Sequence, residues 1–349
     1  MEEYSHLLSL DRESPFLNYR FGVSYIFADR RDTEAPIRYL QKAKANQFEA
    51  NDSYLYYYYM GMAYHLNYMF IESMDYYSEF QKRTPEKIMN KMELEIGVER
   101  LIEMAKNGLD LLGEIKDIYV FSKIEVDKRN FYRSYAFNDF GGKLLYKPTI
   151  FKTKIDKKKN DNSVVFLSDK HNIVFFSSYG NDKNNSRDIY YAVKDNNNKW
   201  GEAIRLSDVI NTPYDEDYPY LLPDGKTLYF SSKGHNSMGG YDIFKSVFDS
   251  TSGKWSEPKN VDFAINTPFD DILFVTDKNE QFAFFSSNRE SIEGLITVYK
   301  VRIDRRPRDV YDFDFSLEAL NVNELQSDCL LYTYQSPRDR TRSRMPSSA

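Results

Sequence analysis

The sequence predicts a mixed α+β protein in which α-helical repeats precede a β-propeller of four-stranded antiparallel blades. Two observations carry this prediction. Over residues 4–107, apolar and aromatic side chains recur at three- and four-residue spacings, the period of amphipathic helices. Residues 163–304 resemble themselves at offsets of 54 and 55 residues, and each copy holds short apolar runs separated by turn residues. A repeat of that length, filled with short strands, is typical of a propeller.

Composition and charge are those of a folded chain. The 349 residues allow two domains of ordinary size, and 29 Tyr and 25 Phe supply apolar mass for their cores. The net charge of −6 argues against a general nucleic-acid surface. A single cysteine, Cys329, excludes an intrachain disulfide framework. No apolar run is long enough for a membrane-spanning helix, and the first residues lack the pattern of a signal peptide.

The helical region divides into two hairpins, residues 14–28 with 33–45 and residues 52–67 with 70–82. Gly22 and Gly61 are expected where the two helices of a hairpin approach so closely that a Cβ would hold them apart. Residues 86–112 are expected to form a third helix that caps the stack. The second hairpin has the spacing of a tetratricopeptide repeat, carried by Tyr57, Met60, Gly61, Tyr64, Ser73, Tyr77, Phe80 and Pro85.

One face of these helices is a candidate protein-binding surface, because aromatic residues combined with Met suit peptide recognition. The alternative is that the same side chains pack against the propeller, and the sequence leaves both open. The candidate residues lie on the first helix of each hairpin and are Tyr19, Val23, Leu55, Tyr58, Met62 and His65.

The middle copy of the repeat shows how one blade would be built. Its strands are expected at 218–222, 227–231, 242–248 and 259–263, and Asp224-Gly225 suits a hairpin turn. The third copy stops after residue 302 without an outer strand, so we expect a strand from within 115–155 to complete it. Three copies are too few to close a ring, which favours four to five blades with a degenerate one from 115–160.

The region between the helices and the repeats is expected to hold strands at 117–121 and 143–146, followed by a solvated, Lys-rich loop at 152–163. The predicted domains are therefore residues 1–112 for the helical repeats and 113–310 for the propeller. Residues 311–349 form a tail, whose polar and Arg-rich end predicts disorder.

Residues that could carry chemistry recur with the blades, and we therefore expect them to serve the fold. Ser177-Ser178 is repeated as Ser231-Ser232, and Trp200 as Trp255. Acidic residues at 215–217 and 270–271 offer oxygen ligands for Ca²⁺, but the spacing of a calcium loop is missing, so capping or ion pairing is favoured. No serine-hydrolase elbow and no metal-ligand spacing of the four histidines occurs. We expect no enzyme, no cofactor and no metal.

Four motifs carry a resemblance to a known family. DGKTLYFSS, GGYDIFKS, GKWSEPKNV and INTPFDD resemble the WD-like, TolB-related propeller repeats of Bacteroidetes envelope proteins, in which tetratricopeptide helices precede the propeller. The likeness covers about residues 10–304. It implies a non-catalytic scaffold in the periplasm or at the outer membrane that binds other envelope proteins, with some members linked to type IX secretion or gliding.

The chain departs from that family in three respects, since it shows no lipoprotein or signal sequence and no OmpA-like domain, and its tail after about residue 310 matches nothing expected there. Without an OmpA-like domain, the resemblance implies no binding of peptidoglycan here. The chain also allows a second function. The alternative function is a glycan- or peptide-binding propeller, whose central mouth would display Trp or Tyr beside polar groups. Trp200 and Trp255 occupy equivalent places in two copies, which favours a structural role for both.

Overall fold

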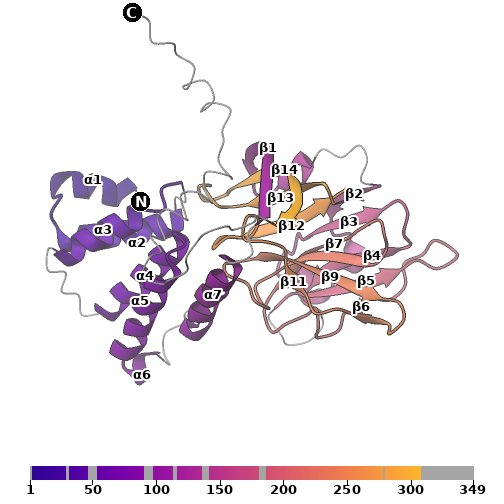
Figure 1. Cartoon of the computed structure of the whole chain (residues 1–349), viewed down its shortest axis with the longest axis horizontal. Coiled ribbons are helices and arrows are strands. Elements are labelled where there is room, and N and C mark those ends of the chain that lie inside the picture. Colours follow the sequence, from indigo (N-terminus) through magenta and orange to yellow (C-terminus); the bar gives the residue numbers. More distant parts are fainter. Residues whose placement is uncertain are drawn as a thin grey trace, which may run out of the picture.

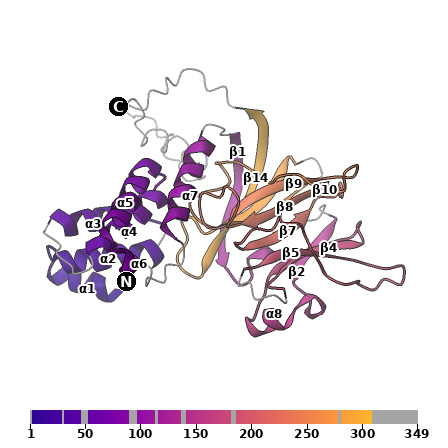
Figure 2. The same cartoon turned by 90° about the horizontal axis from the view of Figure 1, so that it is seen from below.

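In the computed structural model of the chain, a layer of helices lies beside a set of antiparallel sheets (Figures 1 and 2). The structure describes residues 2–28, 31–45, 53–89, 97–112, 116–135, 141–180, 186–277 and 280–307. The fold is mixed α+β, as predicted. The tail expected at 311–349 lies outside the described residues, and none of the helices described has the length and apolar character to cross a membrane.

Within the described residues, the helical layer consists of the two predicted hairpins with one helix before them and two after. Both hairpins are confirmed. In place of a single capping helix, the structure has a short helix and a longer one that packs on the second hairpin. The helices are α1 (Glu2–Leu10), α2 (Pro15–Ala28), α3 (Ala35–Ala45), α4 (Ser53–Leu66), α5 (Phe70–Arg83), α6 (Glu86–Met89) and α7 (Val98–Leu111).

Close approach at the two glycines is confirmed. A Cβ on Gly61 would lie 2.6 Å from the ring of Tyr77, and one on Gly22 would lie 3.0 Å from Cγ of Leu40. Real side chains do not approach so closely without a shift of the neighbour. Glycine is therefore what lets the two helices of each hairpin pack at this distance.

In the second and third copies of the repeat, the strands pair within one antiparallel sheet, whereas the first strand of the first copy pairs outside its own copy. In the second copy, both β10 (Lys254–Trp255) and β11 (Lys259–Asn260) pair with β9 (Asp242–Asp249), so the predicted fourth strand is two short pieces. The strands are β3 (Val164–Ser168), β4 (Ile173–Ser178), β5 (Asp188–Val193) and β6 (Ile204–Arg205); then β7 (Glu216–Leu221), β8 (Thr227–Ser232), β9 (Asp242–Asp249), β10 (Lys254–Trp255) and β11 (Lys259–Asn260); then β12 (Asp271–Thr276), β13 (Phe282–Ser287) and β14 (Leu295–Pro307).

The third copy receives its outer strand from the segment before the repeats. β1 (Lys116–Asp127) pairs antiparallel with β14, which gives the order β1-β14-β13-β12. The prediction that residues 115–155 supply this strand is confirmed. β14 would otherwise present its outer edge to solvent, and an unpaired edge is a liability that a sheet protein has to cover.

The described strands form four sheets, and no closed ring is detected among them. β2 (Gly142–Tyr146) pairs with β3, whereas β4 forms its own sheet with β5 and β6. The first strands of neighbouring copies, β3, β7 and β12, lie side by side in sequence order. The propeller and its four to five blades stay predictions.

The prediction of a solvated loop at 152–163 is wrong in part. This segment contains a short helix, α8 (Lys154–Lys158), which begins with a capping box between Thr153 and Asp156. The lysines at its end are exposed, but Asp156, Asp161 and Ser163 are buried. These polar groups turn inward because a buried lysine from a neighbouring segment, Lys147, lies between the two carboxylates.

Candidate functional site

Among the described residues, the helical layer contacts the sheet side chiefly at the loop of residues 233–240, which joins β8 to β9, and at Phe263. We call this contact the helix–sheet joint. Its centre is apolar: Phe70 and Ala105 from the helices pack with Met238 and Phe263 from the sheets. All four side chains are buried, so the joint removes a continuous apolar surface from water.

Arg100 on α7 fixes the loop of the joint through its guanidinium group. One terminal nitrogen, Nη2, donates to the carbonyl oxygen of Lys233 at 2.9 Å and to Oγ of Ser237 at 2.8 Å. The other, Nη1, donates to the carbonyl oxygen of His235 at 3.2 Å. A planar fork of donors can satisfy several acceptors at once, and a lysine could not replace it here.

His65 at the end of α4 belongs to the same joint. Its Nε2 lies 2.6 Å from the carbonyl oxygen of Met238, and since a carbonyl only accepts, Nε2 must carry the proton. The other nitrogen, Nδ1, is buried without a hydrogen-bond partner. Burial lowers the pKa of His65 to about 4, so the ring is neutral near pH 7.

Of the six predicted protein-binding residues, three are buried: Tyr19, Tyr58 and His65. The Tyr58 ring lies 5.3 Å from that of Phe80, in a cluster that also contains residues of α7. The other three, Val23, Leu55 and Met62, are only partly buried. A role of the six residues in binding a protein stays a prediction.

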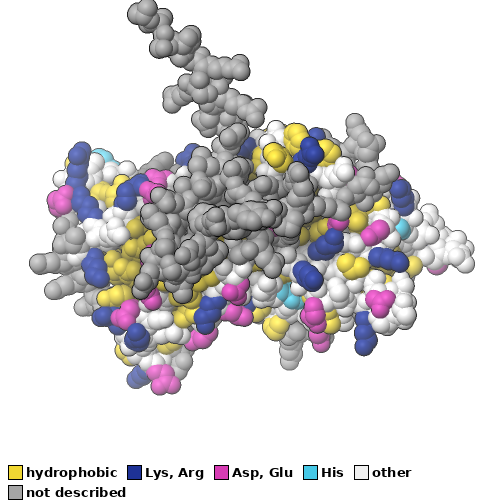
Figure 3. Space-filling view, viewed as in Figure 1, with side chains coloured by type: hydrophobic (Ala, Val, Ile, Leu, Met, Phe, Trp, Pro, Cys, Tyr) yellow, Lys and Arg dark blue, Asp and Glu magenta, His cyan; other side chains and the backbone are white. Residues whose placement is uncertain are grey.

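Two aromatic residues that the sequence pattern did not select complete a partly exposed apolar surface on the helices. Phe27 is 52% exposed, and its ring meets that of Tyr59 edge-on at 6.3 Å. Tyr59 lies one turn from Leu55 and from Met62, and Phe27 lies one turn from Val23. We call these five residues the α2–α4 face. Their spacings of three and four residues are the signal that could have found them. Figure 3 shows hydrophobic side chains at the surface of the helical layer between charged groups.

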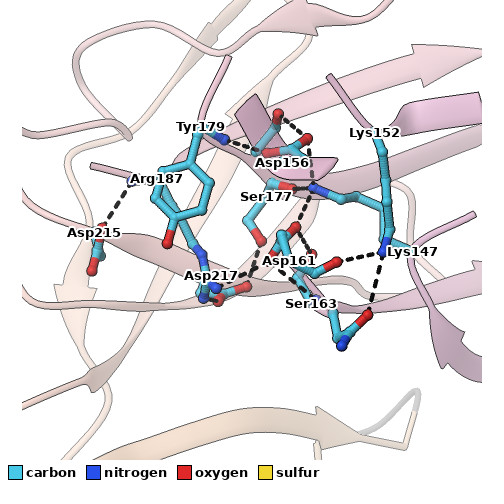
Figure 4. A network of polar contacts seen from close by, with 12 residues as sticks. Lys147, Lys152, Asp156, Asp161, Ser163, Ser177, Tyr179, Arg187, Asp215 and Asp217 are labelled. Atoms are coloured by element: carbon cyan, nitrogen blue, oxygen red, sulfur yellow. Dashed lines mark hydrogen bonds and ion pairs between the residues drawn. The ribbon is translucent and has the colours of Figure 1, made fainter. Parts of the chain in front are cut away.

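A second polar site lies inside the sheets, around Lys147 (Figure 4). The Lys147 Nζ lies 3.0 Å from Oδ2 of Asp156 and 2.6 Å from Oδ2 of Asp161. Arg187 Nη2 lies 3.0 Å from Oδ1 of Asp161, and Nη1 pairs with Asp217. We call these five residues the Lys147 cluster. Four of its side chains are fully buried, and only Arg187 reaches solvent.

The Lys147 cluster connects elements that are distant in sequence. Lys147 follows β2, Arg187 precedes β5, and Asp217 lies on β7. Buried charges are tolerated when they are paired and hydrogen-bonded, and here every carboxylate has a cation partner. These ion pairs join the first copy of the repeat to the second, and the charged side chains of the cluster are paired with one another.

Three half-buried tyrosines lie beside this cluster, and we call them the tyrosine group: Tyr179, Tyr218 and Tyr241. The rings of Tyr218 and Tyr241 are 6.1 Å apart. Two of the rings have a lysine nearby: Lys159 Nζ lies 3.8 Å from the centre of the Tyr179 ring, and Lys233 Nζ lies 4.9 Å from the centre of the Tyr241 ring. Tyrosines with charged neighbours are the composition expected of a ligand-binding mouth.

The recurring carboxylates cap and pair, as predicted. Asp271 forms an ion pair with Arg289 at 2.6 Å. Glu216 accepts hydrogen bonds from Thr212 and from the hydroxyl of Ser232. Burial raises the pKa of Glu216 to about 8, which favours its neutral form in the folded chain.

The recurring serines and tryptophans also hold structural places. The hydroxyls of Ser178 and Ser232 accept from the backbone N–H groups of Gly180 and Gly234, which confirms for these two serines that they satisfy local backbone at the ends of strands. For the other two the prediction is wrong, since Ser177 donates to the carboxylate of Asp217 and Oγ of Ser231 is buried without a hydrogen-bond partner among the described residues. Trp200 and Trp255 pack against the apolar cores of the first two copies.

In the described part of the chain, no group of three or more His, Cys, Asp or Glu side chains is placed to hold a metal ion. No family model, curated protein or solved structure matches the chain.

Proposed function

We propose that the chain is a non-catalytic scaffold of the bacterial cell envelope, in which tetratricopeptide-like hairpins and a β-propeller act by binding other proteins. The hairpins are supported by their glycine contacts at positions 22 and 61. The envelope location, in the periplasm or at the outer membrane, and a link to type IX secretion or gliding rest on the resemblance of the repeat motifs.

The propeller is supported by the order of the strands. The first strands of the three copies lie side by side, and a strand from before the repeats closes the last sheet, as in a ring whose ends must be joined. We propose that β2 and its neighbours supply the degenerate blade. An experimental structure with a central axis surrounded by β3, β7 and β12 would test this arrangement.

The observation that carries the scaffold proposal is the α2–α4 face. The helix–sheet joint uses His65 and Arg100, and the α2–α4 face uses other residues, so docking of the sheets leaves Phe27 exposed. Aromatic and Met side chains on a rigid helical surface are suited to an apolar segment of a partner. The joint would present that surface in one orientation.

The test is a capture experiment with matched variants. Immobilised chain is incubated with envelope extract, and we expect a defined set of proteins to be retained by the wild type and by Ile150→Ser. Ile150 is an exposed apolar residue on the sheet side, so it controls for general stickiness. Phe27→Ser should lose the set. Retention of no stable partner, or of the same proteins by Phe27→Ser, contradicts the proposal.

The tyrosine group favours a second candidate function, the binding of a glycan or a peptide. Its rings offer stacking surfaces, and Asp215 and Asp270 lie at equivalent positions of two copies beside it. Calorimetric titration with hits from a glycan array would test it. Saturable binding that is lost in Tyr241→Ala and kept in Phe27→Ser would favour this function over the scaffold.

A further inference from the structure

The outer strand of the third sheet exposes a row of large apolar side chains. Tyr119 and Phe121 on β1 are each 57% exposed, and Ile124 is 53% exposed. The ring of Phe282, on β13, lies 5.7 Å from that of Phe121 and extends the row. Figure 3 shows hydrophobic side chains at the surface where Figure 1 places β1 and β13.

β1 is also a long edge. It has 12 residues and pairs with β14 on one side, and among the described residues no strand pairs with its other side. The outer strands of the other copies, β6, β10 and β11, have two residues each. Very short edge strands are a normal protection against pairing with other chains, and β1 lacks that protection.

The exposed residues are arranged almost symmetrically about the centre of β1. The midpoint of Lys116–Asp127 falls between Phe121 and Ser122. If a second β1 ran antiparallel about this point, Tyr119 of each copy would lie opposite Ile124 of the other. An aromatic residue opposite a β-branched one is a favourable cross-strand pair. In the same register Lys123 lies opposite Val120, so no like charges oppose each other there.

A β-bulge makes this register sterically consistent. Side chains alternate between the two faces of a regular strand, so Tyr119 and Ile124, five residues apart, would point to opposite faces. The pairing with β14 shifts by one residue between Val120 and Ser122. As a result Tyr119 pairs with Arg302 and Ile124 with Val298, which are four residues apart and share a face. The bulge therefore brings the two apolar positions onto one side of the sheet.

We propose that β1 docks a second copy of this chain, edge to edge and antiparallel, about a two-fold axis between Phe121 and Ser122. The contact is isologous, so both copies bury the same residues and the assembly closes as a dimer. The third sheets of the two copies become one continuous sheet. Backbone hydrogen bonds along β1 supply affinity, and the paired Tyr119 and Ile124 side chains set the register.

The first test is the mass of the full chain in solution, measured by sedimentation over a concentration series. We expect twice the mass of one chain. Ile124→Lys should weaken the dimer about tenfold or more, because it removes both apolar pairs and places a charge in each. Ile204→Lys is the matched control, since Ile204 lies on the outer strand β6 with 51% exposure, and this variant should remain dimeric.

A second test locates the axis without disturbing the apolar residues. In a Cys329→Ser background, Ser122→Cys should form a disulfide between two copies under oxidation, because the axis brings the two positions together. Ser252→Cys, in an exposed turn, should not form one.

Three results would overturn the proposal. If the chain is monomeric at every concentration, the proposed dimer does not form. If a variant without residues 308–349 is dimeric while the full chain is not, the occupant of the β1 edge is a segment of the same chain. A monomer that binds a partner strand, with loss of binding in Ile124→Lys, would identify a different protein as the occupant. A dimer that is unaffected by Ile124→Lys and gives no crosslink at position 122 forms through another surface.

Discussion

Two contacts in this molecule, the helix–sheet joint and the Lys147 cluster, use opposite chemistry. The helix–sheet joint is apolar at its centre, and its polar groups are neutral acceptors, mostly backbone carbonyls, approached by donors of Arg100 and His65. The Lys147 cluster is made of full charges that are buried and paired. An apolar contact can lose one member and keep most of its energy, whereas a buried charge that loses its partner carries the whole cost of desolvation.

The largest effect is therefore expected in the Lys147 cluster. Lys147→Met keeps the approximate length of the side chain and removes its charge, which leaves the buried Asp156 without its cation and Asp161 with Arg187 alone. We expect a loss of about 3–5 kcal/mol in the free energy of unfolding, measured by urea denaturation. A second change, Asp161→Asn, should recover part of the loss, because it removes one of the two carboxylates that Lys147 neutralised.

A matched control for this prediction is Lys123→Met. Lys123 forms an ion pair with Glu290 at 3.3 Å, but both side chains are partly exposed. Exposed pairs contribute at most about 1 kcal/mol, so this variant should unfold almost like the wild type. Equal losses in the two lysine variants would show that the Lys147 cluster does not stabilise the sheets.

Glu216 gives the sheets a pH dependence of their own. Its folded pKa of about 8 lies above its ordinary value of 4.5, so the folded chain holds the proton more tightly than the unfolded chain. The stabilisation is complete below about pH 4.5 and is lost as the pH rises toward 8. The expected loss between about pH 5 and pH 8 is on the order of 3 kcal/mol. Glu216→Gln, measured by urea denaturation at several pH values, should flatten this slope. An unchanged slope would assign it to other groups.

Gly108 tests the packing of the helix–sheet joint. Alanine normally stabilises a helix relative to glycine by about 1 kcal/mol. A Cβ on Gly108, however, would lie 2.5 Å from the ring of Phe70, a core residue of the joint. We expect Gly108→Ala to destabilise the chain by about 2 kcal/mol in thermal unfolding. Gly97→Ala, whose nearest neighbour is 3.6 Å away, is the control. A more stable Gly108→Ala would mean that Phe70 moves aside at little cost.

The same contrast explains which parts of the structure could be predicted from the sequence. Helix hairpins and strand copies were predictable because their residues recur with a period. The outer strand β1 could be predicted because the third copy lacked one. The two contacts do not recur: Arg187 in the first copy is replaced by Tyr241 at the equivalent place in the second. Asp156 and Asp161 lie in a Lys-rich run, and their burial depends on Lys147 approaching from outside that run.

The α2–α4 face shows the same limit on a smaller scale. Helical spacing identified which residues of α4 share a side, but α4 is contacted by α2, α3 and α5, and part of its surface shares a cluster with α7. Tyr58 is buried in that cluster, and His65 is buried against the loop of the joint, while Tyr59 stays partly exposed. A periodic pattern predicts which face of a helix is buried. It does not predict which neighbouring element covers each buried residue.

His65 should give the joint a pH dependence opposite in sign to that of Glu216. Its folded pKa of about 4 lies below its ordinary value of 6.5, so the unfolded chain binds the proton more readily. Stability is therefore complete above about pH 6.5 and falls as the pH is lowered toward 4, by about 1 kcal/mol between about pH 7 and pH 5.5. Protonation would also create a second N–H at the buried Nδ1, which has no acceptor. His65→Gln keeps a donor for the Met238 carbonyl and cannot be protonated, so the loss on acidification, followed by urea denaturation at each pH, should shrink. If acid destabilises the wild type and His65→Gln equally, the sensitivity to acid lies outside the joint.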